Sequence, residues 1–128
     1  MHDACVEALD KAISLLCAGA NGREVHRAVC QVLVDRGYGT ATDGFAGRPG
    51  AASMIHSTGH GVGLEVHEAP SLRDLDCTLL EGDVLTVEPG LYLSGFGGVR
   101  VEDTGLVTVA GFRNFTSLPR SLDPRDYL

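Results

Sequence analysis

The sequence contains no tryptophan, and aromatic residues make up only 5% of its 128 residues. We therefore expect a core built mainly from Val, Leu, Ile and Ala. No apolar run approaches the roughly 18–20 residues that span a bilayer, which argues against a membrane protein. The first residues also lack a basic segment followed by an apolar stretch, so the sequence predicts no secretory signal.

Positive charge and paired cysteines are scarce as well. The net charge of −7 argues against nucleic acid or an anionic membrane as a partner. The four cysteines, at positions 5, 17, 30 and 77, show no C-x-x-C spacing. We expect them to be buried free thiols in a reducing cytoplasm.

The first third of the chain has a helical pattern. Apolar side chains recur every three or four positions in residues 3–18 and again in residues 22–36, which predicts two amphipathic helices. Asn21 and Glu24 predict a capping box at the start of the second helix, and Gly37 predicts its end. His26 lies outside the apolar stripe, so we expect it on the solvent side.

The rest of the chain alternates between loops and strand patterns. Residues 38–53 predict a surface loop in which Asp43 belongs to an Asp-Gly turn rather than a ligand set. Period-two alternation predicts strands at 62–67, 84–88, 91–93 and 99–109. Pro70 is expected to end the first of them, and residues 114–128 show little periodicity.

The most unusual segment is His56–Glu68, which holds three of the five histidines and has glycine at positions 59, 61 and 63. A helix is disfavoured there because each interior glycine costs about 1 kcal/mol relative to alanine. Glycine beside ligand-type side chains also lets backbone or substrate approach closely. The alternative is a tight loop whose histidines only form hydrogen bonds.

Two carboxylates also require an explanation. Glu88 ends an apolar strand, where an unpaired charge is costly. Glu102 lies within another predicted strand, on the same face as Arg100. One interpretation is a structural Arg–Glu pair. The other is a metal site, because carboxylates with one imidazole suit Mn²⁺, Co²⁺ or Zn²⁺, and Arg100 would then orient a ligating carboxylate.

Three segments together resemble a known family: His56–Glu68, Val-Glu-Pro-Gly-Leu-Tyr at 87–92, and Gly-Val-Arg-Val-Glu-Asp-Thr at 98–104. They are similar to the last three metal-site motifs of the M24 metallopeptidases, the pita-bread enzymes that include methionine aminopeptidase, aminopeptidase P and prolidase. Arg-Val-Glu-Asp-Thr resembles the Xaa-Pro dipeptidase and aminopeptidase P branch. The resemblance covers nearly the whole chain. It implies an α+β fold, half of a pita-bread domain, with two helices against a curved, mostly antiparallel sheet.

The resemblance also implies roles for particular residues. His60, Glu88 and Glu102 would be metal ligands, with Glu102 bridging two ions and Glu88 acting as general base. His67 would line the site and bind substrate, and His56 would lie in its outer shell. The implied cofactor is a divalent metal, Mn²⁺ or Co²⁺ rather than Zn²⁺, which activates a hydroxide for attack on a peptide bond next to proline. The implied substrate is a peptide with proline in the second position.

The family's site has two further aspartates on a hairpin before the first helix, whereas this sequence begins at that helix. We therefore expect residues 1–128 to form a single truncated catalytic domain, the C-terminal half. It would bind one ion or none, against two in the intact enzyme, and be inactive as an isolated fragment. The alternative is a non-catalytic half-domain that acts as an interaction module or pairs with a complementing chain, including a second copy in a homodimer.

Overall fold

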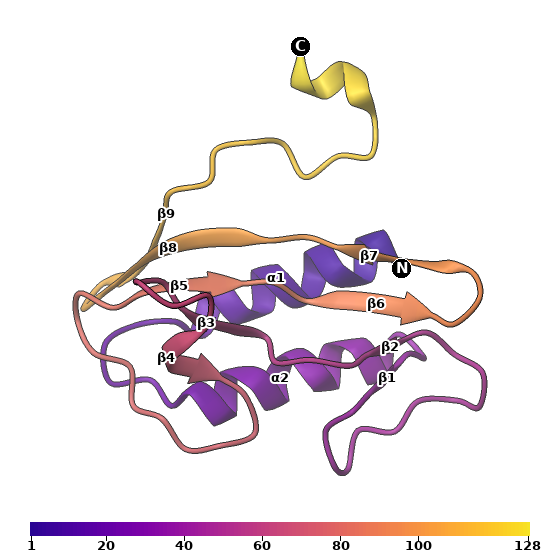
Figure 1. Ribbon diagram of the computed structural model, residues 1–128, viewed down its shortest axis with the longest axis horizontal. Coiled ribbons are helices and arrows are strands. Elements are labelled where there is room, and N and C mark those ends of the chain that lie inside the picture. Colours follow the sequence, from indigo (N-terminus) through magenta and orange to yellow (C-terminus); the bar gives the residue numbers. More distant parts are fainter.

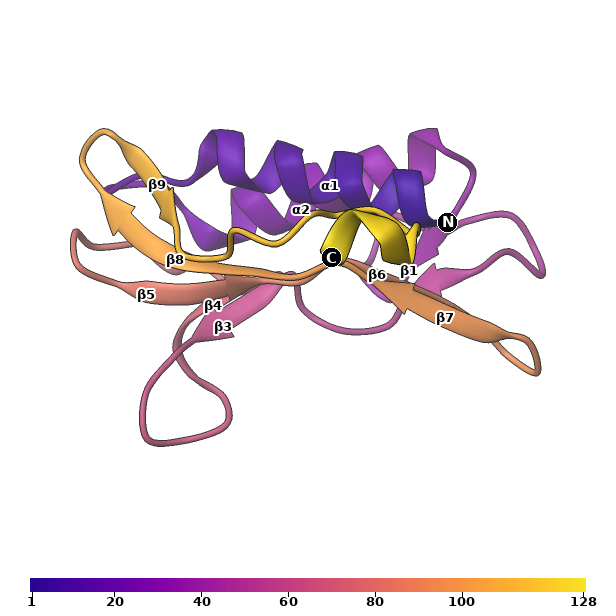
Figure 2. The same ribbon diagram turned by 90° about the horizontal axis from the view of Figure 1, so that it is seen from above.

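Two helices cover one face of a layer of strands in the computed structural model, which describes residues 1–128. Helix α1 spans His2–Leu15 and helix α2 spans Gly22–Asp35, and the two lie side by side (Figures 1 and 2). Neither helix combines the length and apolar character that a membrane crossing requires.

Nine short strands and one 3₁₀ helix follow the two α-helices. The strands are β1 Gly39–Thr40, β2 Ser53–Met54, β3 Gly59–Gly61, β4 Glu68–Leu72, β5 Val84–Val87, β6 Gly90–Leu93, β7 Gly97–Arg100, β8 Asp103–Thr108 and β9 Gly111–Asn114. The 3₁₀ helix η1 spans Pro124–Tyr127, in the segment that arches away from the body in Figure 1.

The strands form two sheets. One has the order β1-β2-β6-β7 and the other β4-β3-β5-β8-β9. All pairs are antiparallel except β1 with β2. The predicted fold class, two helices against a mostly antiparallel strand layer, is therefore confirmed.

The two sheets meet where a long two-stranded ribbon is interrupted. Strand β5 leads into β6 through Glu88 and Pro89, and β7 leads into β8 through Val101 and Glu102. Pairing stops after Val87–Asp103 and resumes at Gly90–Arg100. The two interruptions thus face each other, and each contributes one glutamate to the same place.

The core lies between the helices and the strands. It contains 18 buried apolar residues, among them Leu9 and Leu33 from the helices and Leu85, Leu91 and Val107 from the strands. Full burial of one such side chain contributes about 1.5–3 kcal/mol. This layer holds the strands that carry the candidate site.

The cysteines are all free. Cys5 and Cys30 are buried as expected, whereas Cys17 and Cys77 are half-buried. Burial raises the pKa of the Cys5 thiol to about 11, so this thiol stays protonated and inert at neutral pH.

Several helix details differ from the predictions. The first helix ends at Leu15 rather than at residue 18. Asn21 caps the second helix by accepting from the Arg23 N–H, and Glu24 does not complete a capping box. His26 is only 2% exposed, so its predicted place on the solvent side was wrong. The His26 ring is covered by Thr42 and Thr58, which lie 16 and 32 residues further along the chain.

The strand predictions fail in the central segment. Residues 62–67 form an exposed loop that projects from the face opposite the helices (Figure 2), with Leu64 fully exposed. Alternating apolar residues form a buried strand only where a second layer covers them, and nothing covers this loop. Pro70 lies within β4 instead of ending a strand. Strand β4 is at a sheet edge, where a residue without an N–H is tolerated.

Candidate active site

Three strands converge beside His60, which lies on the short central strand β3. Glycine permits this approach: a Cβ at Gly59 would lie 1.9 Å from the Thr86 carbonyl oxygen, and one at Gly61 would lie 2.1 Å from the Ala69 carbonyl oxygen. Any larger residue would separate β3 from β4 or β5. The two glycines therefore hold the His60 backbone against its neighbouring strands, as the sequence analysis expected.

His60 faces the carboxylate of Glu88. The Nδ1 atom of His60 lies 2.9 Å from the Gly61 carbonyl oxygen, which can only accept, so Nδ1 carries a proton. The Nε2 atom lies 3.3 Å from Glu88 Oε1. Thr86 links the two residues, since its hydroxyl accepts from the His60 N–H at 3.1 Å and donates to Glu88 Oε1 at 3.3 Å.

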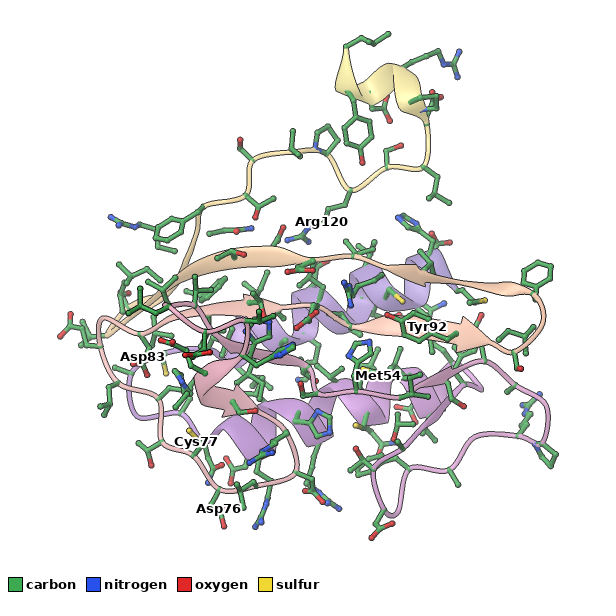
Figure 3. The ribbon with its side chains drawn as sticks, in the orientation of Figure 1. Met54, Asp76, Cys77, Asp83, Tyr92 and Arg120 are labelled. Atoms are coloured by element: carbon green, nitrogen blue, oxygen red, sulfur yellow. The ribbon has the colours of Figure 1, made fainter.

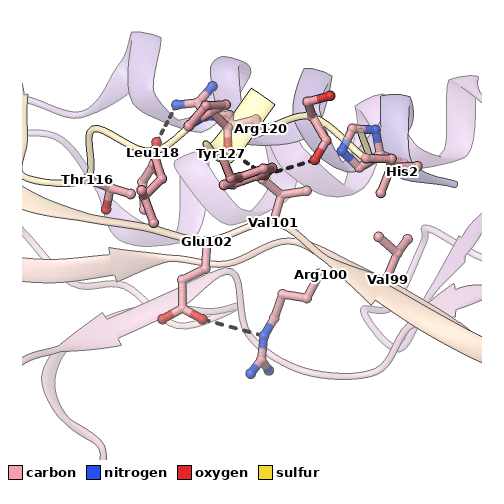
Figure 4. A pocket seen from close by; sticks show the side chains of 13 residues that line it. His2, Val99, Arg100, Val101, Glu102, Thr116, Leu118, Arg120 and Tyr127 are labelled. Carbon is pink, nitrogen blue, oxygen red and sulfur yellow. Dashed lines mark hydrogen bonds and ion pairs between the residues drawn. The ribbon is translucent and has the colours of Figure 1, made fainter. Parts of the chain in front are cut away.

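Glu102 reaches the same place through Arg100. The Arg100 guanidinium lies 3.4 Å from Glu88 Oε2 and 3.5 Å from Glu102 Oε2, so it bridges the two carboxylates. Figure 4 shows Arg100 and Glu102 on one side of the β7–β8 junction and Arg120 on the other. Glu88 is 8% exposed, whereas the Glu102 side chain is 39% exposed.

The His60–Glu88 pair fits one side of a divalent-ion site. With a proton on Nδ1, the Nε2 atom of His60 faces a carboxylate oxygen, and such a contact needs a proton or a metal cation between the two atoms. A histidine whose other ring nitrogen donates to a carbonyl is also the usual arrangement of a metal ligand. No three His, Cys, Asp or Glu side chains are grouped closely enough to hold one ion, however, so the pair is not a complete site.

Of the two remaining predicted histidines, His67 contacts His60, whereas His56 contacts Ser57 and Tyr92. The exposed ring of His67 packs edge-on against His60, with 4.6 Å between ring centroids. His56 donates from Nδ1 to the Ser57 carbonyl at 2.7 Å, and its Nε2 accepts from the Tyr92 hydroxyl at 3.0 Å. The Ser57 carbonyl can only accept, so it fixes the tautomer of His56, and Tyr92 on β6 (Figure 3) bonds to the other ring nitrogen.

A cavity of about 600 Å³ opens beside His60 and His67. Its other walls include Ser57, Ser71 and Arg73, and Arg73 forms no ion pair. The cavity therefore combines hydroxyl groups, the Glu68 carboxylate and the cationic side chain of Arg73 next to the histidines.

Residues that hold the site were missed from the sequence. Thr86 lies two positions before Glu88 on the same strand face, so period-two alternation could have identified it as a neighbour of the Glu88 carboxylate. Tyr92 ends the Val-Glu-Pro-Gly-Leu-Tyr motif at 87–92 but was assigned no role. Arg73 gave no local signal, because the fold alone brings it beside the histidines.

Comparisons with known proteins identify the family of the chain. A sequence model described as "Metallopeptidase family M24" matches residues 1–109. The chain belongs to this metallopeptidase family. An Xaa-Pro dipeptidase of Pyrococcus furiosus is 38% identical over 123 residues, which are 95% of this chain and 32% of the relative.

Solved structures of M24-like enzymes show the same likeness. The prolidase of Pyrococcus horikoshii matches with a TM-score of 0.80 and 35% identity, over 96% of this chain and 32% of that one. An X-Pro aminopeptidase of Thermotoga maritima matches with a TM-score of 0.78 and 34% identity, over 94% of this chain and 31% of that one. The chain thus spans about a third of the length of the relatives it matches.

Proposed function

We propose that the chain provides the C-terminal half of the catalytic domain of a metal-dependent Xaa-Pro peptidase. The observation that carries this proposal is the opposition of His60 Nε2 and Glu88 Oε1 at 3.3 Å, with Nδ1 of His60 fixed by a carbonyl. Membership of the M24 family supports it, as do relatives named Xaa-Pro dipeptidase.

In this proposal His60, Glu88 and Glu102 would hold divalent metal. One imidazole with carboxylates favours Mn²⁺ or Co²⁺ over Zn²⁺. We propose two ions for an intact enzyme and one or none for these 128 residues, because no three donors are grouped in the structure. Bound metal would supply Lewis-acid activation of water.

The chain's own residues would orient substrate and move protons. Glu88 would act as general base, held toward the site by the Thr86 hydroxyl. Arg100 would orient Glu88 and Glu102 through its two ion pairs. His67 would contact substrate at the edge of the cavity, and His56 would support the site from the Tyr92 side.

The substrate we propose is a peptide with proline in the second position. The cavity beside His60 and His67 supports a short peptide, and Arg73 offers a cation to a substrate carboxylate. The net charge of −7 supports neither nucleic acid nor an anionic membrane as a partner. Four free cysteines support a cytoplasmic location.

A second candidate function is a non-catalytic half-domain that needs another chain, including a second copy. Two observations favour it. The donors are incomplete, and Val62, Leu64 and Val66 are exposed in the β3–β4 loop. Exposed apolar side chains gathered in one region are typical of surfaces that bind a partner.

Hydrolysis of Xaa-Pro dipeptides with Mn²⁺ or Co²⁺ tests the proposal. We expect the purified 128-residue chain to be nearly inactive, and to gain activity when a second chain supplies the aspartate-bearing hairpin. In that complemented enzyme Glu102→Gln should abolish turnover. Glu65→Gln, in the exposed loop, is the control and should have little effect. Rapid hydrolysis by the chain alone that survives Glu102→Gln would contradict the proposal.

A further inference from the structure

His26 is a buried histidine that the proposed chemistry does not use. It lies on α2 and is 2% exposed. Both ring nitrogens have partners: Nδ1 lies 2.8 Å from the Thr58 hydroxyl, and Nε2 lies 2.7 Å from the Thr42 hydroxyl. Burial lowers the pKa of His26 more than nearby Asp74 raises it, so the ring is neutral at neutral pH.

Thr58 connects this histidine to the candidate site. It is fully buried, and its hydroxyl has His26 as its one hydrogen-bond partner. Its N–H donates to the Leu72 carbonyl at 2.8 Å, and its carbonyl accepts from the Glu88 N–H at 2.7 Å. The side chain of Thr58 is therefore held by α2, while its backbone holds Glu88.

The bond from Glu88 to Thr58 matters because the ribbon is interrupted there. Val87 pairs with Asp103 and Gly90 pairs with Arg100, but Glu88 lies between these pairs and has no partner in the β8 ladder. Its N–H faces β3 and bonds to the carbonyl of Thr58, the residue directly before that strand. The position of Thr58 therefore sets where the backbone of Glu88 lies relative to His60.

We propose that His26 is a positioning residue for Glu88, acting through Thr58. The inference rests on the proposed function only for the role of Glu88 as a ligand, since the path from His26 to the Glu88 backbone is independent of metal. Removal of the His26–Thr58 bond frees the Thr58 segment, and the Glu88 carboxylate then loses its fixed direction toward His60.

The test compares two hydroxyls that bind the same imidazole. Thr58→Val and Thr42→Val each remove one partner of His26, but only Thr58 is bonded to Glu88. The measured quantity is the amide hydrogen-exchange rate of Glu88 divided by that of Val107 on β8, both followed by NMR. We expect this ratio to rise about fivefold or more in Thr58→Val, as loss of one net hydrogen bond implies. Thr42→Val should leave this ratio near that of the unsubstituted chain.

Two further variants separate positioning from general destabilisation. Thr58→Ser keeps the hydroxyl and should restore the exchange ratio. If Thr58→Val does not fold, His26→Leu combined with Thr58→Val removes both partners of the buried bond and leaves only the half-buried Thr42 hydroxyl without its imidazole, which is the better tolerated change. An unchanged Glu88 ratio in whichever of these variants folds would overturn the inference.

Titration of the same variants with Mn²⁺ distinguishes this inference from the proposed function. We expect Thr58→Val to weaken Mn²⁺ binding about fivefold relative to Thr42→Val, in proportion to the mobility of Glu88. If the unsubstituted chain binds no Mn²⁺ with or without the complementing chain, the metal role of Glu88 fails. The exchange ratio then still decides whether His26 positions it.

Discussion

Replacement of Arg120 should be among the most destabilising single changes in this chain. Arg120 contacts the carboxylate of Asp103, whose side chain is only 2% exposed, and also lies 2.5 Å from Asp10 on α1. Hydrogen bonds to the two carboxylates raise the pKa of Arg120 despite the opposing effect of burial. In Arg120→Met the stem is kept and the charge is lost, so Asp103 remains buried without its cation.

The loss of stability in Arg120→Met is the sum of two ion pairs, one with Asp103 and one with Asp10. Removing one partner of a buried ion pair typically costs about 3–5 kcal/mol. Asn114 still donates to Asp103 at 2.6 Å, which points to the lower end, about 3 kcal/mol. The Asp10 half contributes about 1 kcal/mol or less, because that carboxylate is 62% exposed.

Urea unfolding followed by circular dichroism measures the free energy of unfolding of each variant. Arg120→Met reports the loss of both contacts, and the matched control Asp10→Asn reports the loss of the Asp10 contact alone. A second variant, Arg120→Met with Asp103→Asn, removes the orphaned charge and should recover much of the loss. If Arg120→Met costs no more than Asp10→Asn, the buried carboxylate does not depend on Arg120 and the reasoning is wrong.

Three further predictions concern acid, metal and packing. Burial lowers the pKa of His26, so in acid the unfolded chain binds a proton that the folded chain excludes. The stability that neutral His26 contributes should therefore be complete above about pH 6.5 and be lost as pH falls through the folded pKa. His26→Gln should reduce this loss of stability in acid, measured as the shift of the urea midpoint with pH. EDTA should remove any bound Mn²⁺ without changing the circular dichroism spectrum, and a cooperative loss of helix signal on chelation would contradict a weak, incomplete site. Gly59→Ala should lower stability by about 1–3 kcal/mol through contact with the Thr86 carbonyl, whereas Gly19→Ala, which has open space around its Cβ, should show only backbone strain.

The sequence predicted the elements whose signal is local. Helical periodicity located both helices within a few residues, and alternation located β5 and β6. Glu88 was correctly placed at a strand end, because Pro89-Gly90 follows it directly. The resemblance to M24 enzymes supplied the fold, which periodicity alone does not specify.

The failures share one cause, which is that burial depends on distant segments. Residues 62–67 alternate like a strand, yet no layer covers them. The predicted strand 99–109 is interrupted at Val101 and Glu102 because it must bend where the opposite strand is interrupted at Glu88. His26 was placed in solvent because Thr58, which covers it, lies 32 residues away. Pattern analysis within a window detects none of these.

The contacts of Arg120 have a consequence for how the chain folds during synthesis. Asp10 and Arg120 are 110 residues apart, so their bond forms only after the segment through Arg120 has left the ribosome. Helices α1 and α2 need only local contacts and can form early, whereas β8 must bury the Asp103 carboxylate and gains its cation last. We therefore expect the Asp103 carboxylate to lack its cation until Arg120 emerges, so that the contact of β8 with α1 through Arg120 is completed late in synthesis.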